Sequence, residues 1–130
     1  MQTIKPSAVL TPRQTSFYRE NGFLVVEDLF QMSRLDRILQ IYEERADASY
    51  SGIMNLDREV EDIRKLVTDP QIVNILQALQ NNPVSLLQNM FLFKKCGSAY
   101  AAQSWNPHQD NAYPQARVGA YITGNIAFCR

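Results

Sequence analysis

The stretch WNPHQDNAYPQA, residues 105–116, contains the single histidine of this 130-residue chain, and an aspartate follows two positions later. If the stretch is a β-strand, His108 and Asp110 lie on one face, because residues i and i+2 of a strand point the same way. One imidazole nitrogen and one carboxylate oxygen on the same face can bind a divalent metal ion from one side. With a second histidine they would form the three-ligand site of non-heme Fe(II) oxygenases. The pair is therefore a candidate metal site.

An H-x-D pattern alone is weak evidence for a metal site, because so short a pattern is frequent by chance. One alternative is a surface histidine that only hydrogen-bonds the neighbouring aspartate. Another is a metal-binding protein of a different class, although tight sites generally use three or more protein ligands. The residue pattern by itself leaves these interpretations open.

The first two thirds of the chain show helical signals. Residues that favour helix starts are each followed by a segment with apolar residues at helical spacing. This pattern indicates helices that pack against a shared core. The expected helices cover residues 12–21, 33–47, 57–67 and 70–79, with Thr11, Ser33 and Asp69 as N-caps and with Gly22 as the end of the first helix.

Three segments have the composition of strands. Residues 23–30, 84–95 and 120–128 are rich in β-branched and aromatic side chains, whereas residues 49–56 are expected to form a loop. Two or three strands rarely make a stable sheet alone, although helices can support one. Helices followed by strands predict an α+β protein.

The segments LLQNMFLFKKCGS, WNPHQDNAYPQA and GAYITGNIAF resemble the phytanoyl-CoA dioxygenase family, most specifically from Gln88 to Phe128. Residues 17–30, FYRENGFLVVEDLF, are similar to the opening helix and strand of that family. The resemblance implies a double-stranded β-helix, or cupin-like jelly roll, with helices packed against one side. It implies one domain over residues 1–130, with mainly helical support over 1–82 and the first jelly-roll strands over 83–130.

The resemblance also implies an activity. Enzymes of this family use Fe(II) and 2-oxoglutarate as co-substrate to hydroxylate a C–H bond with O2, releasing succinate and CO2. His108 and Asp110 match the first two iron ligands, and Met90 matches a position that borders the 2-oxoglutarate site. Asn125 falls where many members place a tryptophan beside the co-substrate, which is a departure from the family pattern. The expected substrate is a small organic or acyl molecule.

The family pattern continues with a second histidine and with an arginine that binds the distal carboxylate of 2-oxoglutarate. This chain has no second histidine, and Arg130 comes too early to be that arginine. We therefore expect an N-terminal fragment of such an enzyme, truncated after the H-x-D strand region and inactive by itself. The competing interpretation is a non-catalytic product whose helices and open strand edge form an interaction module.

Composition narrows the expected partners. Thirteen basic residues balance thirteen acidic ones, so the net charge does not favour binding to nucleic acid or to an anionic membrane. The first 14 residues lack the apolar segment of a secretory signal, and no run approaches the roughly 20 apolar residues of a membrane helix. Cys96 and Cys129 match no zinc or redox spacing and are expected to be reduced thiols. These features predict a cytoplasmic protein.

Overall fold

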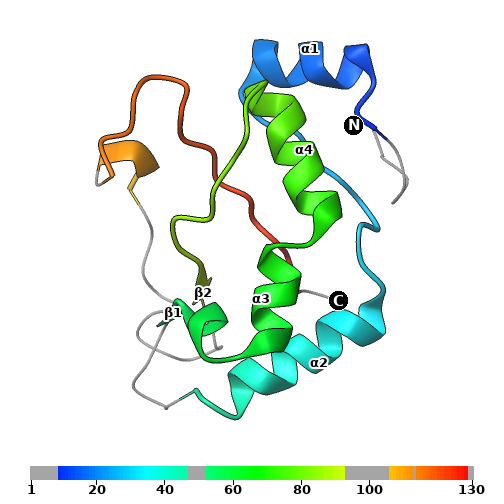
Figure 1. Ribbon diagram of the computed structural model, residues 1–130, viewed down its shortest axis with the longest axis vertical. Coiled ribbons are helices and arrows are strands. Elements are labelled where there is room, and N and C mark those ends of the chain that lie inside the picture. The colour runs from blue at the N-terminus through cyan, green and yellow to red at the C-terminus, as the bar shows by residue number, and fades with distance from the viewer. Residues whose placement is uncertain (1–8, 47–51, 93–105, 113, 129–130) are drawn as a thin grey trace.

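The computed structural model describes residues 9–46, 52–92, 106–112 and 114–128. These residues form helices and a small two-stranded antiparallel sheet, which confirms the α+β class. In Figure 1, α1 lies across one end of α4, and α3 and α2 continue toward the other end of the molecule. None of the described helices has the length and apolar character needed to cross a membrane. The elements are α1 (Pro12–Asn21), α2 (Met32–Glu43), β1 (Gly52–Met54), the 3₁₀ helix η1 (Leu56–Arg58), α3 (Glu61–Val67), α4 (Pro70–Gln80), β2 (Met90–Leu92) and the 3₁₀ helix η2 (Asp110–Ala112).

Local caps explain where α1 and α4 begin. The Thr11 hydroxyl accepts a hydrogen bond from the Gln14 N–H at 3.3 Å, and Gln14 Oε1 accepts one from the Thr11 N–H at 2.8 Å. Asp69 Oδ1 accepts the Gln71 N–H at 2.9 Å at the start of α4. α1 ends at Gly22, whose φ of 79° suits a residue without a β-carbon. These three sequence predictions are confirmed.

α2 begins before its predicted cap. Ser33 is the second residue of the helix, so the prediction that it caps the helix is wrong. The first turn closes instead on the carbonyl of Gln31, which accepts the N–H groups of Arg34 and Leu35. The helix ends at Glu43, earlier than predicted. Its apolar face is nevertheless buried as predicted, since three of its side chains lie in the core: Leu35, Ile38 and Tyr42.

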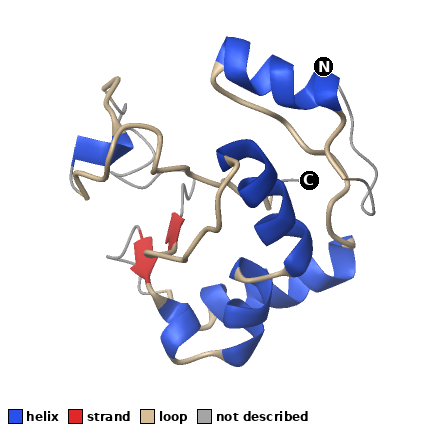
Figure 2. Cartoon of the chain, turned by 45° about the horizontal axis from the view of Figure 1, so that its top comes forward, coloured by secondary structure: helices blue, strands red, loops and turns tan. Residues whose placement is uncertain are grey.

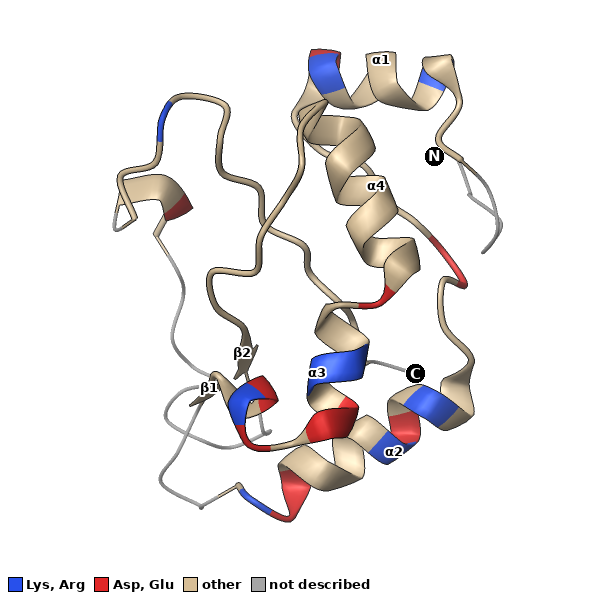
Figure 3. Ribbon diagram, viewed as in Figure 1, with Lys and Arg blue, Asp and Glu red and all other residues tan. Residues whose placement is uncertain are grey.

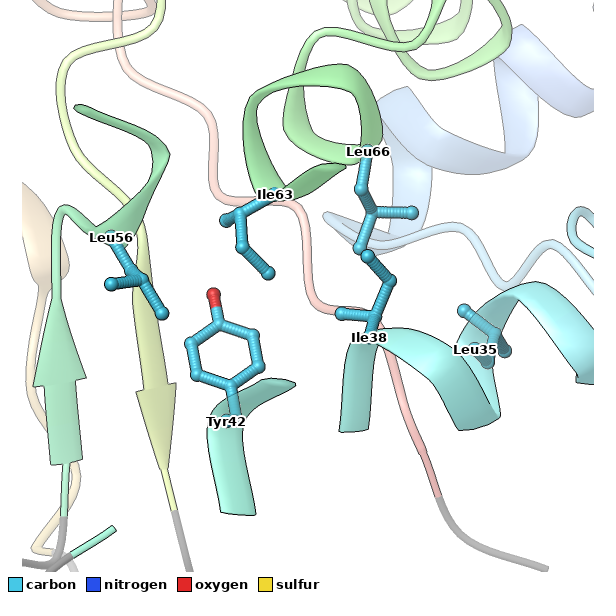
Figure 4. Close-up of a cluster of buried hydrophobic side chains, with 6 residues drawn as sticks. All are labelled: Leu35, Ile38, Tyr42, Leu56, Ile63 and Leu66. Atoms are coloured by element: carbon cyan, nitrogen blue, oxygen red, sulfur yellow. The ribbon is translucent and has the colours of Figure 1, made fainter. Parts of the chain in front are cut away.

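One apolar cluster joins α2 and α3 to the sheet. Phe91 of β2 stacks on the Tyr42 ring with centroids 4.0 Å apart, and Phe128 meets Phe91 edge to face at 5.3 Å. These contacts tie the last described segment of the chain to α2 and to the sheet. Figure 4 shows the six buried side chains of this core cluster: Leu35, Ile38, Tyr42, Leu56, Ile63 and Leu66.

Ion pairs link the helices on the outside of the core. Arg34 contacts Asp69 at 2.6 Å, which joins α2 to the cap of α4, and Arg37 contacts Asp62 of α3 at 2.9 Å. Burial by itself would raise the pKa of Asp69, but hydrogen bonds from Arg34 and from the Gln71 backbone lower the pKa below its usual value. Figure 3 shows charged residues on α2, η1 and α3, whereas α4 carries none.

The sheet is smaller than the sequence predicts. β1 pairs with β2 in antiparallel register, with Ile53 opposite Phe91 and Met54 opposite Met90. β1 lies within residues 49–56, so the loop prediction is wrong for Gly52–Met54. Of the predicted strand 84–95, only Met90–Leu92 pairs, and residues 93–95 lie outside the described residues. A ladder forms only where two segments run side by side, and the described part of β1 is three residues long.

Residues 23–30 and 120–128 are not strands, contrary to the sequence prediction. No ladder partner pairs with either segment among the described residues. Asp28 has a φ of 54°, which interrupts an extended chain. Aromatic residues of both segments pack on the core cluster, including Phe30 and Phe128. Some of these apolar residues pack on the core without strand pairing, so composition alone misassigned the two segments.

Candidate functional site

The structure brings His108 and Asp110 together, but not along a strand. Residues 106–109 have no regular structure, and Asp110 is the first residue of η2. The turn is closed by the Ala112 N–H, which donates to the Gln109 carbonyl at 3.0 Å. Across this turn, His108 Nε2 lies 3.2 Å from Asp110 Oδ1. The strand geometry predicted for this pair is therefore wrong, while the two side chains do face one another.

The hydrogen bond made by Nδ1 of His108 determines the tautomer of the imidazole ring. His108 Nδ1 lies 2.8 Å from the carbonyl oxygen of Asn106. A carbonyl oxygen only accepts hydrogen bonds, so Nδ1 carries the hydrogen. In the neutral ring, Nε2 is then an acceptor directed at a carboxylate oxygen, which is also an acceptor. A metal ion bound between these two acceptors would satisfy both of them.

The second oxygen of the carboxylate is held by a residue from a different part of the chain. Thr123 Oγ1 donates to Asp110 Oδ2 at 2.8 Å, across 13 positions of sequence. The segment that carries Thr123 continues to Ile126 and Phe128, which pack against the core cluster. Thr123 therefore connects the turn to the body of the protein. The sequence analysis missed this residue, since a threonine within a β-branched run gives no signal of such a contact.

The loop after the turn is closed by one asparagine side chain. Asn111 Nδ2 donates to the Ala116 carbonyl at 3.0 Å, and Asn111 Oδ1 accepts the Ala116 N–H at 2.8 Å. Gln115 has a φ of 51°, as a tight turn requires of one residue. The sequence analysis also missed this clamp, although asparagine near proline is a common turn signal. The clamp limits how far η2 can move relative to the following loop.

The pair is open to solvent. The side chains of His108 and Asp110 are 46% and 47% exposed, and no side chain in the described residues from 106 to 128 is fully buried. In Figure 1 and in Figure 2, η2 stands apart from the four α-helices. A metal ion or a small molecule can therefore reach the pair directly from solvent.

Comparisons with known proteins do not assign this site. The chain matches no model of a known protein family, no curated protein and no solved structure. The function must therefore be argued from the geometry and from the resemblance in the sequence.

The other two predicted site residues are placed differently. Met90 lies in β2, opposite Met54, and its side chain is 45% exposed. β2 and η2 occupy separate parts of the ribbon in both views (Figure 1, Figure 2). Asn125 is exposed and lies two residues after Thr123, in the segment that contacts Asp110. Asn125 thus shares a segment with the site, whereas Met90 belongs to the sheet.

A shallow hollow between α2 and α3 is a second feature of the surface. Its basic groups already have partners, because Arg34 pairs with Asp69, Arg37 pairs with Asp62, and Lys65 lies 3.9 Å from Glu61. Arg34 and Arg37 thus link α2 to the start of α4 and to α3, whereas Lys65 pairs with a residue of its own helix. Six residues line the hollow: Ser33, Arg34, Arg37, Ile38, Asp62 and Lys65.

The donors at the turn fit part of an iron site. An imidazole nitrogen and a carboxylate oxygen are two of the three ligands in the facial site of Fe(II) oxygenases. The hydrogen bonds from outside the pair are of the kind that orient metal ligands. Within the described ranges, no group of three or more His, Cys, Asp or Glu side chains is placed to hold a metal ion. The predicted thiols Cys96 and Cys129 lie outside those ranges.

Proposed function

We propose that the chain belongs to an Fe(II)/2-oxoglutarate-dependent dioxygenase that hydroxylates a C–H bond of a small organic or acyl substrate. The observation that carries the proposal is the approach of His108 Nε2 to Asp110 Oδ1 at 3.2 Å. In such a reaction R–H, O2 and 2-oxoglutarate become R–OH, succinate and CO2. Fe(II), when bound, supplies electrons and open coordination positions for the activation of O2.

The residues of this chain have separate roles in the proposal. His108 and Asp110 hold the metal ion, and Asn106 keeps the imidazole in the tautomer that presents Nε2. Met90 and Asn125 border the co-substrate, as the resemblance implies, which requires that β2 and the turn approach one another in the active protein. A third protein ligand is needed in addition to the pair. The proposal includes a jelly roll that extends the β1–β2 sheet, a cytoplasmic location, and no binding to nucleic acid.

Metal binding by the chain tests the proposal directly. Mn²⁺, which occupies similar sites and is followed by electron paramagnetic resonance, is titrated against the wild type and against His108→Ala and Asp110→Asn. We expect measurable binding by the wild type and loss of that binding in both variants. Glu20→Gln, which removes an exposed carboxylate from α1, is the matched control and should bind as the wild type does. Equal binding by all four proteins would show that the pair is not the metal site.

Dependence on 2-oxoglutarate separates a dioxygenase from another metal-binding protein. If the co-substrate binds beside the metal ion, 2-oxoglutarate should tighten Mn²⁺ binding, because the effect of each ligand on the other is reciprocal. Glutarate, which lacks the keto group, should not have this effect. Succinate formation with Fe(II) and O2, abolished by His108→Ala, is the activity expected of a longer protein that supplies the third ligand, whereas the present chain should bind metal without turnover. Metal binding that is indifferent to 2-oxoglutarate would favour a metal protein of another class.

A non-catalytic interaction module is the second candidate. Apolar side chains are exposed on the sheet and on the segment that leads into it, including Met54 at 53% and Leu87 at 60%. Exposed apolar side chains grouped in this way are typical of surfaces that bind other proteins. Absence of metal binding, together with concentration-dependent association in size-exclusion chromatography that Leu87→Ser reduces, would support this candidate over the enzyme.

A further inference from the structure

We propose that Thr123 is a positioning residue that reserves one oxygen of Asp110, so that Asp110 binds a divalent metal ion through Oδ1 alone. The inference rests on the proposed function of the His108–Asp110 pair as metal ligands. It adds a residue that the sequence pattern does not contain, and it specifies which carboxylate oxygen is the ligand.

The two carboxylate oxygens of Asp110 have different contacts. Oδ2 accepts the hydroxyl of Thr123 at 2.8 Å, whereas Oδ1 faces His108 Nε2 at 3.2 Å. A hydroxyl donor on a carboxylate is a charge-assisted hydrogen bond, which is stronger than a neutral one. The oxygen that remains directed at the imidazole is the one available to share a cation with Nε2.

Asp110 needs such a restraint because its surroundings provide little packing. Its side chain is 47% exposed and begins a 3₁₀ helix of only three residues. An exposed aspartate exchanges readily between rotamers, and each rotamer directs Oδ1 to a different place. Threonine suits the restraining role because its β-branched side chain has few accessible χ1 rotamers.

Thr123 is itself held by the core. Three residues further along the chain Ile126 packs against the core cluster, and Phe128 meets the Phe91 ring edge to face. The hydroxyl of Thr123 is therefore presented by a segment that is anchored on the helices and the sheet. Through this segment, the position of a ligand atom in the turn is coupled to the packing of β2.

The test compares Thr123→Val with Thr123→Ser in the Mn²⁺ titration. Valine keeps the shape of threonine and removes the hydroxyl, so we expect the dissociation constant of Mn²⁺ to rise about 10- to 100-fold, as is typical when a partner of a metal ligand is lost. Serine keeps the hydroxyl and should bind nearly as tightly as the wild type. Thr15→Val, in which a hydroxyl on α1 is lost from a bond to the Thr11 carbonyl, is the matched control.

The outcomes distinguish this inference from the proposed function. If Thr123→Val binds as the wild type does while Asp110→Asn loses binding, Thr123 has no positioning role and the metal site stands. If Thr123→Ser is as weak as Thr123→Val, the hydroxyl is not responsible and the inference fails. If the wild type binds no Mn²⁺, both proposals fail. Urea unfolding checks that the Thr123 variants keep their fold, because a general loss of structure would also lower affinity for Mn²⁺. The unfolding curves of these variants should match that of the wild type.

Discussion

Tyr42 offers a quantitative test of the core, because its phenol is buried between helices and sheet. Figure 4 shows its hydroxyl end directed toward Leu56 and Ile63. Burial, with a smaller contribution from the Asp57 carboxylate, raises the pKa of Tyr42 from 10.0 to about 12. In the unfolded chain the phenol is hydrated and titrates near its ordinary value.

The sign of the pH effect follows from these two values. Between pH 10 and about 12 the folded protein keeps a phenol proton that the unfolded chain has lost. The contribution is fully present below the unfolded pKa and is lost as pH rises through the folded pKa. With about 1.4 kcal/mol for each unit of pKa difference, the free energy of unfolding falls by roughly 2–3 kcal/mol over this interval.

Urea unfolding of the wild type and of Tyr42→Phe measures this loss. The difference in unfolding free energy between the two proteins should be constant near neutral pH and should change by roughly 2–3 kcal/mol between pH 10 and about 12, in the direction that favours the variant. Asp57→Asn should lower the pKa of Tyr42 part of the way, which an ultraviolet titration of the folded protein detects. Parallel pH profiles for wild type and Tyr42→Phe would refute the burial of this phenol.

Variants at two further residues test the start of α4 and the packing of the core. Asp69→Asn should destabilise the protein by about 1 kcal/mol or more at neutral pH, because it removes the charge that pairs with Arg34 while keeping an oxygen that can cap α4. Because the pKa of Asp69 is lowered in the folded protein, the stability that its carboxylate contributes is present above the unfolded pKa and is lost as pH falls through the folded pKa. The difference in unfolding free energy between wild type and variant, measured with urea, should therefore be smaller at acid pH. Ile63→Ala should cost about 2–5 kcal/mol and Ile63→Val about 0.5–1.5 kcal/mol, since Ile63 is completely buried. Thermal or urea unfolding that gave equal values for the two Ile63 variants would contradict the close packing around this residue.

The starts of α1 and α4 and the end of α1 could be predicted from the sequence because these boundaries depend on neighbours in the chain. Thr11 with Pro12, and Asp69 with Pro70, contain within a few residues both the acceptor and the donors of the cap. Gly22 likewise needs only its own conformational freedom. The cap of α2 failed because Ser33 has the right type but the backbone closes one turn on Gln31, which no local rule indicated.

Strands and the site depend on residues that are distant in the sequence. A strand requires a partner, and residues 23–30 and 120–128 have a strand's composition without one among the described residues. For the candidate site, the residue types and their short spacing were enough to identify His108 and Asp110 as candidate ligands. The turn that joins them and the hydroxyl of Thr123, 13 positions from Asp110, could not be read from the sequence. Asp110 and Thr123 meet through a hydrogen bond across the chain, and the segment of Thr123 also packs on the core through Ile126 and Phe128.

The segment that carries the candidate site is held to the rest of the molecule by few contacts. Its described residues, 106–112 and 114–128, bury no side chain completely, and its packing on the core runs through Ile126 and Phe128. Segments of this kind open locally at a lower free energy than packed helices, so their amide hydrogens exchange sooner. When only the closed form binds a ligand, the observed affinity is the intrinsic affinity multiplied by the closed fraction. A metal ion that binds the turn would therefore slow amide exchange across the whole segment, and the exchange rates would report the fraction of molecules in which the site is assembled.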